Sequence, residues 1–596
     1  MIKQRLLLVI VALSACAMWG ALHIEMLRTQ LSDWSFPYRF GISKTSHMMV
    51  PMRDGVRLRS DVYLPLKGEQ FPTILVRTTY EGFESDVSLF LAQQGYAVVH
   101  QHVRGRFGSE GDYRVHAYSG RDGYDTLDWI VRQPWSNGKV GTYGCSFRGE
   151  NQIILAAENH PAHVALIAEG SGGAIGSAQD SYGYFGVFEN GVLNLASAAG
   201  WFSVHGRLAN LDEAPDTAFA ERLAQHYATL PLAALSAQHI EYRTELDDFF
   251  SRKLTDGWWD EQGYISHHDR FSAAALHVNT WFDQTAHDTF RLAEHMRQKA
   301  MNERAKQQHV LLGPGQHCQG KNLKSGTISV GQMKIAYTEI DYKQIYLDWF
   351  DYWLKDKEVS LPPAYRYFTV HENLWQSSEV WPPLATSERR WFLSEGQLLD
   401  EPPADSGVIE YRYDPADPVP TLGGTICCTG NSVVNKAGLV DQRDLLSRKD
   451  VVLFKSEPLD ADVKVTGNAK VALQVASSAT DTDFTVKLVD VYPDGRHFNV
   501  HDGVMRMRYR EGVARESLIE PGRIYAIELE LRPVSYVFKA GHQLALMVSS
   551  SNFPRLARNL NTGGVEYKES GYETAVNQIY FGGQHASFLS LPVNRN

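Results

Sequence analysis

The 596-residue chain has few cysteines, and none of them stands in a spacing typical of zinc ligands. The five cysteines lie at positions 16, 145, 318, 427 and 428, without a C-x-x-C pair or a matching cysteine and histidine motif. The sequence therefore predicts no metal site. The redox state of the four cysteines from Cys145 onward cannot be assigned from their spacing.

A basic surface, an internal repeat and a low-complexity tract are also lacking. Asp and Glu number 69 against 58 Lys and Arg, which gives a net charge of -11 and no basic run. Nucleic-acid binders carry basic faces, so we expect no nucleic-acid partner. The hydrophobic content of 43% is that of a globular protein, and the length exceeds what one hydrophobic core supports, so two or more domains are expected.

Long apolar runs are missing except near the N-terminus, where LLLVIVALSACAMWGAL (residues 6–22) follows the basic MIKQR. This pattern predicts a signal peptide, a lipoprotein signal or a membrane anchor over residues 1–30. The run is at the short limit for a membrane span. Leu13 to Cys16 is similar to a lipobox, although the segment after Cys16 is apolar where such linkers are usually polar. We expect an exported protein, periplasmic or membrane-tethered, that meets the membrane only through this segment; a frayed apolar terminus is the alternative.

The pattern of apolar residues changes three times along the remaining chain. Short apolar runs alternate with helical periods over residues 46–175 and again from about 271, which is typical of a parallel sheet covered by helices. Residues 176–270 look helical and inserted, and inserted helices commonly form a lid over strand ends. The insert is rich in aromatic residues, some of which we expect to form its own core. From about 363 the period is two, which favours an antiparallel sandwich such as a jelly roll.

Polar side chains follow the apolar runs where the carboxyl ends of parallel strands would meet. Ser146, Asp283 and His317 do so in the chain order expected of an α/β-hydrolase. Serine becomes a nucleophile when an imidazole takes its proton, and a carboxylate fixes that imidazole's tautomer. These residues are our candidate nucleophile, acid and base, in that order, with the Phe147 amide beside the serine as an oxyanion donor.

Each candidate has an alternative. Ser146 could be a helix N-cap in a glycine-rich turn. His287 and His309 compete with His317, and Asp288 competes with Asp283. His317 is preferred because GPGQHC places it in a loop just past a strand, whereas His287 stands in an apparent helix. Cys145 and Cys318 each adjoin a candidate residue, so a disulfide between them is one open possibility.

Several motifs resemble one family. RTTYEG, QHVRGRFGSEGDY, GTYGCSFRGE, NTWFDQT and GPGQH, with SEPLDADVKVTG, DTDFTVKLVDVYPDGR and SSSNFPRLARNLNTGG nearer the C-terminus, resemble the cocaine esterase and X-Pro dipeptidyl-peptidase family of serine hydrolases. That family includes α-amino acid ester hydrolases and glutaryl acylases. The resemblance runs from about Ser46 to the C-terminus. Two departures are Phe147, where a tyrosine is usual, and His102, where many members have an acid whose charge pairing is thus in doubt.

The resemblance implies an α/β-hydrolase domain in two parts (44–175 and 271–362), a helical cap (176–270) and a C-terminal jelly roll (363–596). It implies the triad Ser146, Asp283 and His317, with Tyr80 completing the oxyanion hole beside Phe147, and no cofactor. The oligomeric state stays open.

The residue types of the cap predict the kind of substrate. We expect hydrolysis of an ester or amide bond of a small acyl compound, with the aromatic cap as the specificity element. An X-Pro dipeptidyl-peptidase or an amino acid ester hydrolase must hold a free ammonium with carboxylates. The cap has candidates for this, although their convergence on Ser146 does not follow from the sequence: Asp180, Glu189, Asp212 and Glu213. A tethered, inert binding protein is the alternative from another class.

Overall fold

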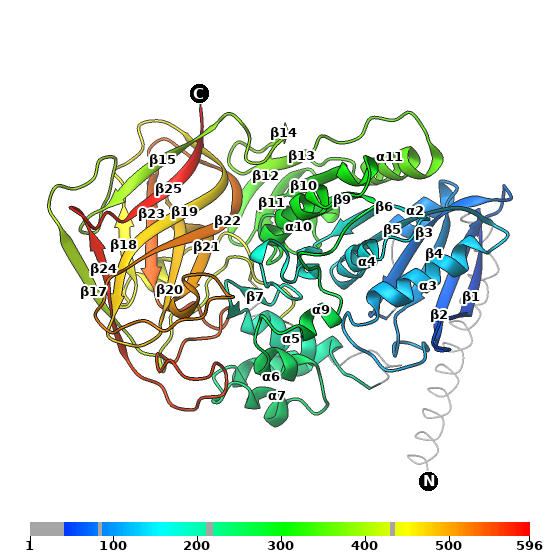
Figure 1. Ribbon diagram of the computed structural model, residues 1–596. Coiled ribbons are helices and arrows are strands. Elements are labelled where there is room, and N and C mark those ends of the chain that lie inside the picture. Colours follow the sequence, from blue (N-terminus) through cyan, green and yellow to red (C-terminus); the bar gives the residue numbers. More distant parts are fainter. Residues whose placement is uncertain (1–40, 82–85, 210–217, 430–435, 596) are drawn as a thin grey trace, which may run out of the picture.

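The computed structural model describes residues 41–81, 86–209, 218–429 and 436–595 (Figure 1). The predicted signal or anchor segment, including Cys16, lies outside the described residues. Among the helices of the described ranges, none is both long enough and apolar enough to cross a membrane.

A ten-stranded mixed sheet forms the centre of the N-terminal part of the molecule. Its central strands run parallel, and only the pairs at its two edges are antiparallel. Three of the parallel strands, Phe71–Thr78, His163–Glu169 and Ala274–Thr280, are buried throughout, which explains their nearly continuous apolar sequences. In spatial order the strands are β1 (Ile42–Pro51), β2 (Arg57–Pro65), β4 (Ala97–His102), β3 (Phe71–Thr78), β5 (Ser136–Cys145), β6 (His163–Glu169), β9 (Ala274–Thr280), β10 (Gln308–Gly313), β13 (Tyr365–Thr369) and β14 (Leu374–Ser378).

Helices cover both faces of this sheet (Figure 1). One face packs against α2 (Asp86–Gln93) and α11 (Tyr342–Lys355), whose Trp349 and Phe350 are fully buried against the strands. The other packs against α3 (Ser119–Val131), α4 (Phe147–Ala157) and α10 (Ala286–Gln298). The carboxyl ends of β5, β9 and β10 therefore open toward the same edge of the sheet.

The first sheet extends beyond its predicted end at residue 362. β13 pairs in parallel with β10, and β14 pairs antiparallel with β13 and ends at Ser378. The strand order thus places residues 365–378 in the first sheet, beyond the predicted border at residue 363, and the border itself stays a prediction.

A segment of short helices lies between β6 and β9, at the bottom centre of Figure 1. Its aromatic side chains form a common core with Phe147 of α4. The elements are β7 (Phe188–Glu189), β8 (Val192–Leu193), α5 (Leu195–His205), α6 (Ala218–Leu223), α7 (Ala234–His239), α8 (Leu246–Ser251) and α9 (Trp258–Glu261). We call this segment the cap.

The C-terminal region is all β, apart from single turns. One large apolar core joins its two sheets and reaches Trp281 and Phe368 of the first sheet. The seven-stranded sheet contains β16 (Leu398–Leu399), β15 (Thr386–Leu393), β25 (Phe588–Asn594), β19 (Val463–Ser477), β24 (Ala575–Phe581), β17 (Gly407–Tyr413) and β22 (Tyr525–Phe538). The four-stranded sheet contains β18 (Val452–Lys455), β23 (Gln543–Ser549), β20 (Asp483–Val491) and β21 (His497–Arg506). A separate hairpin, β11 (Gly326–Val330) with β12 (Met333–Tyr337), precedes α11.

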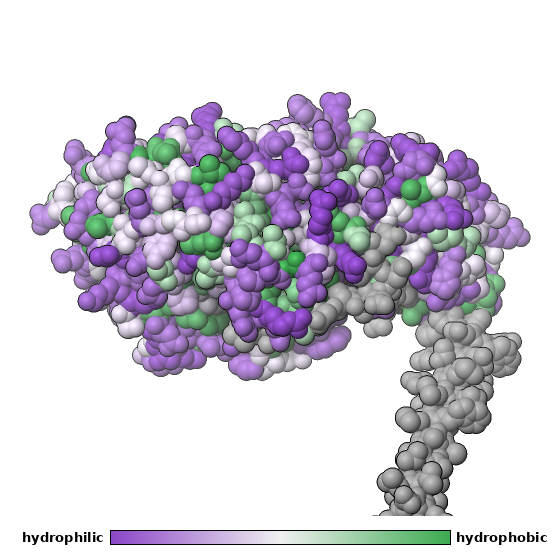
Figure 2. Space-filling view, turned by 90° about the horizontal axis from the view of Figure 1, so that it is seen from below, coloured by the Kyte–Doolittle hydropathy of each residue, from purple (hydrophilic) through white to green (hydrophobic). Residues whose placement is uncertain are grey.

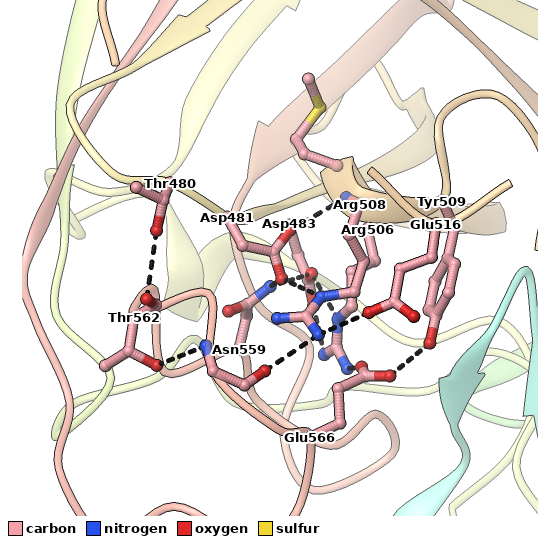
Figure 3. A network of polar contacts seen from close by, with 12 residues as sticks. Thr480, Asp481, Asp483, Arg506, Arg508, Tyr509, Glu516, Asn559, Thr562 and Glu566 are labelled. Atoms are coloured by element: carbon pink, nitrogen blue, oxygen red, sulfur yellow. Dashed lines mark hydrogen bonds and ion pairs between the residues drawn. The ribbon is translucent and has the colours of Figure 1, made fainter. Parts of the chain in front are cut away.

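A buried ionic network lies at one end of β20 and β21 (Figure 3). Arg506 Nε and Nη2 donate to the two carboxylate oxygens of Asp483 at 2.8 Å each, and Arg508 Nε donates to Asp481 at 2.7 Å. The Asn559 amide donates to both carboxylates, at 3.0 and 2.8 Å. Burying charge is costly unless it is paired in this way, so the network fixes how the connecting loops meet.

The face shown in Figure 2 is covered mostly by hydrophilic side chains, with hydrophobic ones in small scattered groups. The cap is tied to the all-β region by charge as well as by packing. Glu189 of β7 accepts hydrogen bonds from Arg532, at 2.6 Å, and from Arg555, and all three side chains are largely buried. Burial would raise the pKa of Glu189, but the two guanidinium groups keep it below its usual value.

Candidate active site

Ser146 occupies the tight turn between β5 and α4. Its φ of 62° and ψ of -134° are unusual for a residue with a side chain, and its N–H donates to the Glu169 carbonyl at 2.9 Å. A Cβ at Gly144 would lie 2.4 Å from that of Arg148, and one at Gly149 would lie 2.6 Å from the Glu169 oxygen. Ser146 stands at the N-cap position, yet its side chain makes no capping hydrogen bond. The N-cap interpretation is therefore wrong as an account of its hydroxyl.

Asp283 and His317 come together from the ends of β9 and β10. His317 Nδ1 lies 2.5 Å from Asp283 Oδ2, and Asp283 is completely buried. Oδ1 of the same carboxylate accepts from the Thr285 amide at 2.7 Å and from the Thr285 hydroxyl at 2.8 Å. These contacts fix the carboxylate, which in turn fixes the imidazole ring.

The two groups shift each other's pKa. Burial acts to lower the pKa of His317, but the charge and hydrogen bond of Asp283 outweigh it, so the pKa is raised above its usual value. Burial acts to raise the pKa of Asp283, and the contacts with His317 and Thr285 lower it overall. His317 thus gains proton affinity, while Asp283 stays ionised to stabilise an imidazolium.

His317 Nε2 is buried and has no hydrogen-bond partner among the described residues. Its ring lines the same cavity as Ser146. A buried nitrogen without a partner is costly, and such an exception in a native protein calls for a functional explanation. An imidazole lone pair that lines the same cavity as a serine is suited to accept that serine's proton once the two atoms come within hydrogen-bond reach.

Tyr80 follows β3, and its hydroxyl lies 3.3 Å from Ser146 Oγ. Trp201 of α5 donates its indole N–H to the same tyrosine oxygen at 3.3 Å. Burial raises the pKa of Tyr80, so the phenol keeps the proton that it could donate to an oxyanion. Phe147 begins α4, where the first N–H groups of a helix lack partners within the helix. Tyr80 and the Phe147 amide thus flank Ser146.

These side chains line a cavity of about 1120 Å³. Trp201, Val204 and His205 of α5 form the cap's share of its wall. Other aromatic residues of the cap, such as Phe249 and Trp259, pack inside the cap instead. Two carboxylates also line the cavity, but Asp341 caps α11 by accepting from the Gln344 amide at 3.0 Å, and Glu339 accepts from the Ser325 amide at 3.0 Å.

Two disulfides lie at the site. Cys145 is joined to Cys318, with the Cα atoms 6.0 Å apart, so the residue before Ser146 is linked to the residue after His317. This pair was one open possibility from the sequence. Cys427 is joined to its neighbour Cys428. Their two sulfur atoms and a ring nitrogen of His317 all lie within 4.8 Å of one another.

The structure places the rival residues elsewhere. His309 lies within β10 and contacts the Pro362 carbonyl at 2.8 Å, and His287 of α10 lies 3.5 Å from the Asn468 amide nitrogen. Asp288 accepts a hydrogen bond from Ser181 at 2.7 Å. Of the four acids of the cap, Glu189 is held by arginines and Asp180 is exposed beside His267, while Asp212 and Glu213 lie outside the described residues.

His102 and its neighbourhood take a structural role. His102 is buried with its ring against Phe107, and burial lowers its pKa to about 4. Arg104, two residues after the end of β4, pairs with Asp54 and Asp122 at 2.7 Å each. The acid expected at position 102 in the family is therefore not needed to partner Arg104 here.

Sequence reasoning missed a buried pair behind the nucleophile. His116 Nε2 lies 2.8 Å from Glu150 Oε2, and the His116 ring stacks on Phe147 with centroids 5.0 Å apart. Burial raises the pKa of Glu150 to about 8 and lowers that of His116 to about 3, so both are neutral at pH 7 and the glutamic acid donates. The only signal in the sequence was an acid in the first turn of α4, which the helix dipole would also explain.

Comparisons with known proteins agree on one group. Residues 54–319 match the model of the X-Pro dipeptidyl-peptidase (S15 family), and residues 350–590 match that of the X-Pro dipeptidyl-peptidase C-terminal non-catalytic domain. Cocaine esterase of Rhodococcus sp. (strain MB1 Bresler) is 33% identical, over 92% of this chain and 98% of its own. An α-amino acid ester hydrolase is 25% identical in sequence with a TM-score of 0.79, over 93% of this chain and 97% of its own. An aminopeptidase from a marine sediment Thaumarchaeota archaeon has a TM-score of 0.80 at 24% identity, over 93% and 97% of the two chains, and shows the shared fold.

Proposed function

The chain belongs to the cocaine esterase and X-Pro dipeptidyl-peptidase family of serine hydrolases, and we propose that it uses Ser146, His317 and Asp283 to cleave its ester substrates. The observation that carries this assignment is the Asp283–His317 contact of 2.5 Å beside a buried, unpartnered Nε2. Serine, histidine and aspartate recur as a catalytic triad on unrelated folds, where the imidazole activates the hydroxyl and the carboxylate orients the imidazole.

The chemistry follows from the geometry. Ser146 Oγ attacks the substrate carbonyl carbon while His317 Nε2 accepts the hydroxyl proton, and Asp283 stabilises the imidazolium. Tyr80 and the Phe147 amide donate to the tetrahedral oxyanion. When the carbonyl reforms, the leaving alcohol takes the proton from His317. Water then attacks the acyl-serine by the same route, which releases the acid and restores the Ser146 hydroxyl.

A small acyl group without a free ammonium fits the cavity best. Both carboxylates on its wall, Glu339 and Asp341, accept backbone hydrogen bonds, and Lys321 is paired with Glu169 at 3.2 Å. A free substrate ammonium would need a carboxylate to pair with it. Neither of the described acids that the sequence suggested for this, Asp180 and Glu189, lines the cavity. Trp201 offers an apolar surface beside the nucleophile instead.

An X-Pro dipeptidyl-peptidase activity is the second candidate, favoured by the two family models that match the chain. We also propose the finer description of the fold: the ten-stranded sheet with its inserted cap is an α/β-hydrolase domain, and the two C-terminal sheets form a jelly roll. Export through residues 1–30 remains our proposal for the location. Palmitate labelling of wild type against Cys16→Ser tests the lipid tether, which an equal label on both would exclude.

One assay separates the functions. The full-length chain is offered a p-nitrophenyl ester and an X-Pro anilide, beside Ser146→Ala. We expect ester turnover that the alanine variant loses by several orders of magnitude, as when other triad serines are removed. Retained turnover in the variant would exclude Ser146 as the nucleophile. Preference for the anilide would favour the peptidase, and turnover of neither would favour a binding protein.

A further inference from the structure

We propose that Cys427 and Cys428, once reduced, form with His317 a binding site for a thiophilic divalent cation such as Zn²⁺, which switches the hydrolase off. Two sulfur atoms and an imidazole nitrogen are a ligand set that zinc prefers. The proposal goes beyond hydrolysis, and it shares only His317 with the proposed catalytic residues.

The positions of the three ligand atoms carry the proposal. They lie within 4.8 Å of one another, whereas the edge of a tetrahedron with zinc–ligand bonds of 2.1 to 2.3 Å is about 3.4 to 3.8 Å. Reduction removes the bond that holds the two sulfurs together, and rotation about the cysteine side-chain bonds can then bring the sulfurs to the tetrahedral spacing.

The imidazole is already arranged as a metal ligand. Asp283 holds Nδ1, so the nitrogen left for a cation is Nε2, which is buried and has no partner among the described residues. In zinc sites, the histidine nitrogen that does not bind the metal is commonly hydrogen-bonded to a carboxylate. This hydrogen bond fixes the ring and makes the other nitrogen a stronger ligand. Asp283 would thus serve the cation in the same way as it serves catalysis.

The surroundings admit both a reductant and a cation. Cys428 lines the cavity and is half-buried, so the disulfide can be reached from the same opening as Ser146. The ionised carboxylate of Asp283 lies 2.5 Å from Nδ1 of His317, so negative charge stands directly behind the proposed ligand. With three protein ligands, the fourth position of the cation would face the cavity, where water or a small ligand can occupy it.

The chemistry balances in two steps. A dithiol reductant passes two electrons and two protons to the Cys427–Cys428 disulfide and is itself oxidised to a disulfide, which leaves two thiols. The cation then replaces the two thiol protons, which go to solvent, and takes the Nε2 lone pair. With that lone pair occupied, His317 cannot accept the Ser146 proton. In the oxidised protein the sulfurs are not thiolates, so hydrolysis is protected from the cation.

The test uses the full-length chain, reduced with a phosphine and freed of it by anaerobic desalting, with thiols counted before use. Co²⁺ is added as a spectroscopic substitute for Zn²⁺, and thiolate-to-cobalt charge-transfer absorption is measured. We expect one Co²⁺ per reduced chain with this absorption, and none in the oxidised chain. Zn²⁺ should lower ester turnover of the reduced chain by ~10-fold or more, because it occupies the base, and a chelator should restore it.

Two double variants locate the site, each compared with its own metal-free turnover. Cys427→Ser/Cys428→Ser should lose both the absorption and the zinc inhibition, while Cys145→Ser/Cys318→Ser should keep both. The proposal is overturned if the reduced wild type binds no Co²⁺, if the absorption follows the Cys145–Cys318 pair, or if Zn²⁺ inhibits the oxidised chain equally. Absorption without any ester turnover would contradict the proposed hydrolysis and leave the metal site established.

Discussion

Two buried groups of polar side chains in this molecule are satisfied to different degrees. In the ionic network of the all-β region, Asp481, Asp483, Arg506 and Arg508 leave no buried nitrogen or oxygen without a partner among the described residues (Figure 3). At the candidate active site, His317 is equally well held on its Nδ1 side, but Nε2 has no such partner. Buried ion pairs and hydrogen bonds thus satisfy the buried polar atoms of the all-β network. At the candidate active site the same types of contact leave His317 Nε2 available for reaction.

The difference lies in which bonds are completed within the protein. A network that satisfies all its members rigidifies its surroundings, and removing one member leaves a charge buried alone. A catalytic group must leave one hydrogen-bonding atom free to contact the substrate. The free protein is less stable by the hydrogen bond that this atom does not make. Substitutions in the two regions should thus separate activity from stability, and the following predictions test that separation.

The largest effect is expected at the unpartnered imidazole. His317→Ala removes the base, and Asp283→Asn removes the acceptor that holds the tautomer, so each should lower kcat for a p-nitrophenyl ester by about 10⁴-fold or more. The melting temperature should fall little in comparison. His287→Ala is the control, because this histidine is not on the cavity wall; its folded fraction should turn over the ester normally. Near-normal turnover in His317→Ala would exclude it as the base.

The network should show the reverse pattern. Arg506→Met leaves Asp483 without its two-pronged partner, and breaking a buried pair in this way costs about 3–5 kcal/mol of unfolding free energy. Arg523→Met is the matched control, since Arg523 and Glu520 are both exposed and such pairs contribute about 0–1 kcal/mol. Urea unfolding measures both, and turnover per folded molecule should be unchanged. Equal loss of stability in the two variants would contradict the comparison.

The separate parts of the site were predictable from the sequence to the extent that they follow strand ends. Ser146, Asp283 and His317 each come just after a buried strand, and parallel strands bring their carboxyl ends together. Contacts that the cap and the C-terminal region make with the site could not be predicted in this way. Trp201 reaches Tyr80, and Cys427 reaches His317, across long stretches of chain that no periodicity relates.

The fold shows the same limit. The change from buried runs to alternation correctly separated an α/β part from an all-β part, because strands buried on both faces differ in composition from strands buried on one. It did not indicate that β13 and β14, which follow the predicted border, complete the first sheet. A strand's pairing partner is decided by tertiary contacts. The sequence around Tyr365 contains no local pattern that indicates which strand it pairs with.

A smaller loss of activity is expected at the oxyanion donor. Tyr80→Phe removes a hydroxyl that is aimed at Ser146, and one such donor contributes about 10²- to 10³-fold in kcat. KM for the ester should change less, because the oxyanion exists only in the transition state. Tyr227→Phe is the control: it removes a cap hydroxyl that lies 3.4 Å from the Ala196 carbonyl, and it should leave kcat unaltered. A loss confined to KM would argue that Tyr80 binds substrate instead.

The smallest effect is expected behind the nucleophile, at a buried acid that is neutral rather than paired by charge. Burial raises the pKa of Glu150 to about 8, against about 4.5 when unfolded, so between these values the unfolded chain holds fewer protons and stability falls as pH rises. Glu150→Gln keeps a donor for His116 but cannot ionise. Relative to wild type, the variant should gain about 2 kcal/mol or less in unfolding free energy between pH 5 and pH 7, measured by urea unfolding. Parallel pH profiles for the two proteins would mean that Glu150 is charged at neutral pH and belongs with the paired acids of the all-β network.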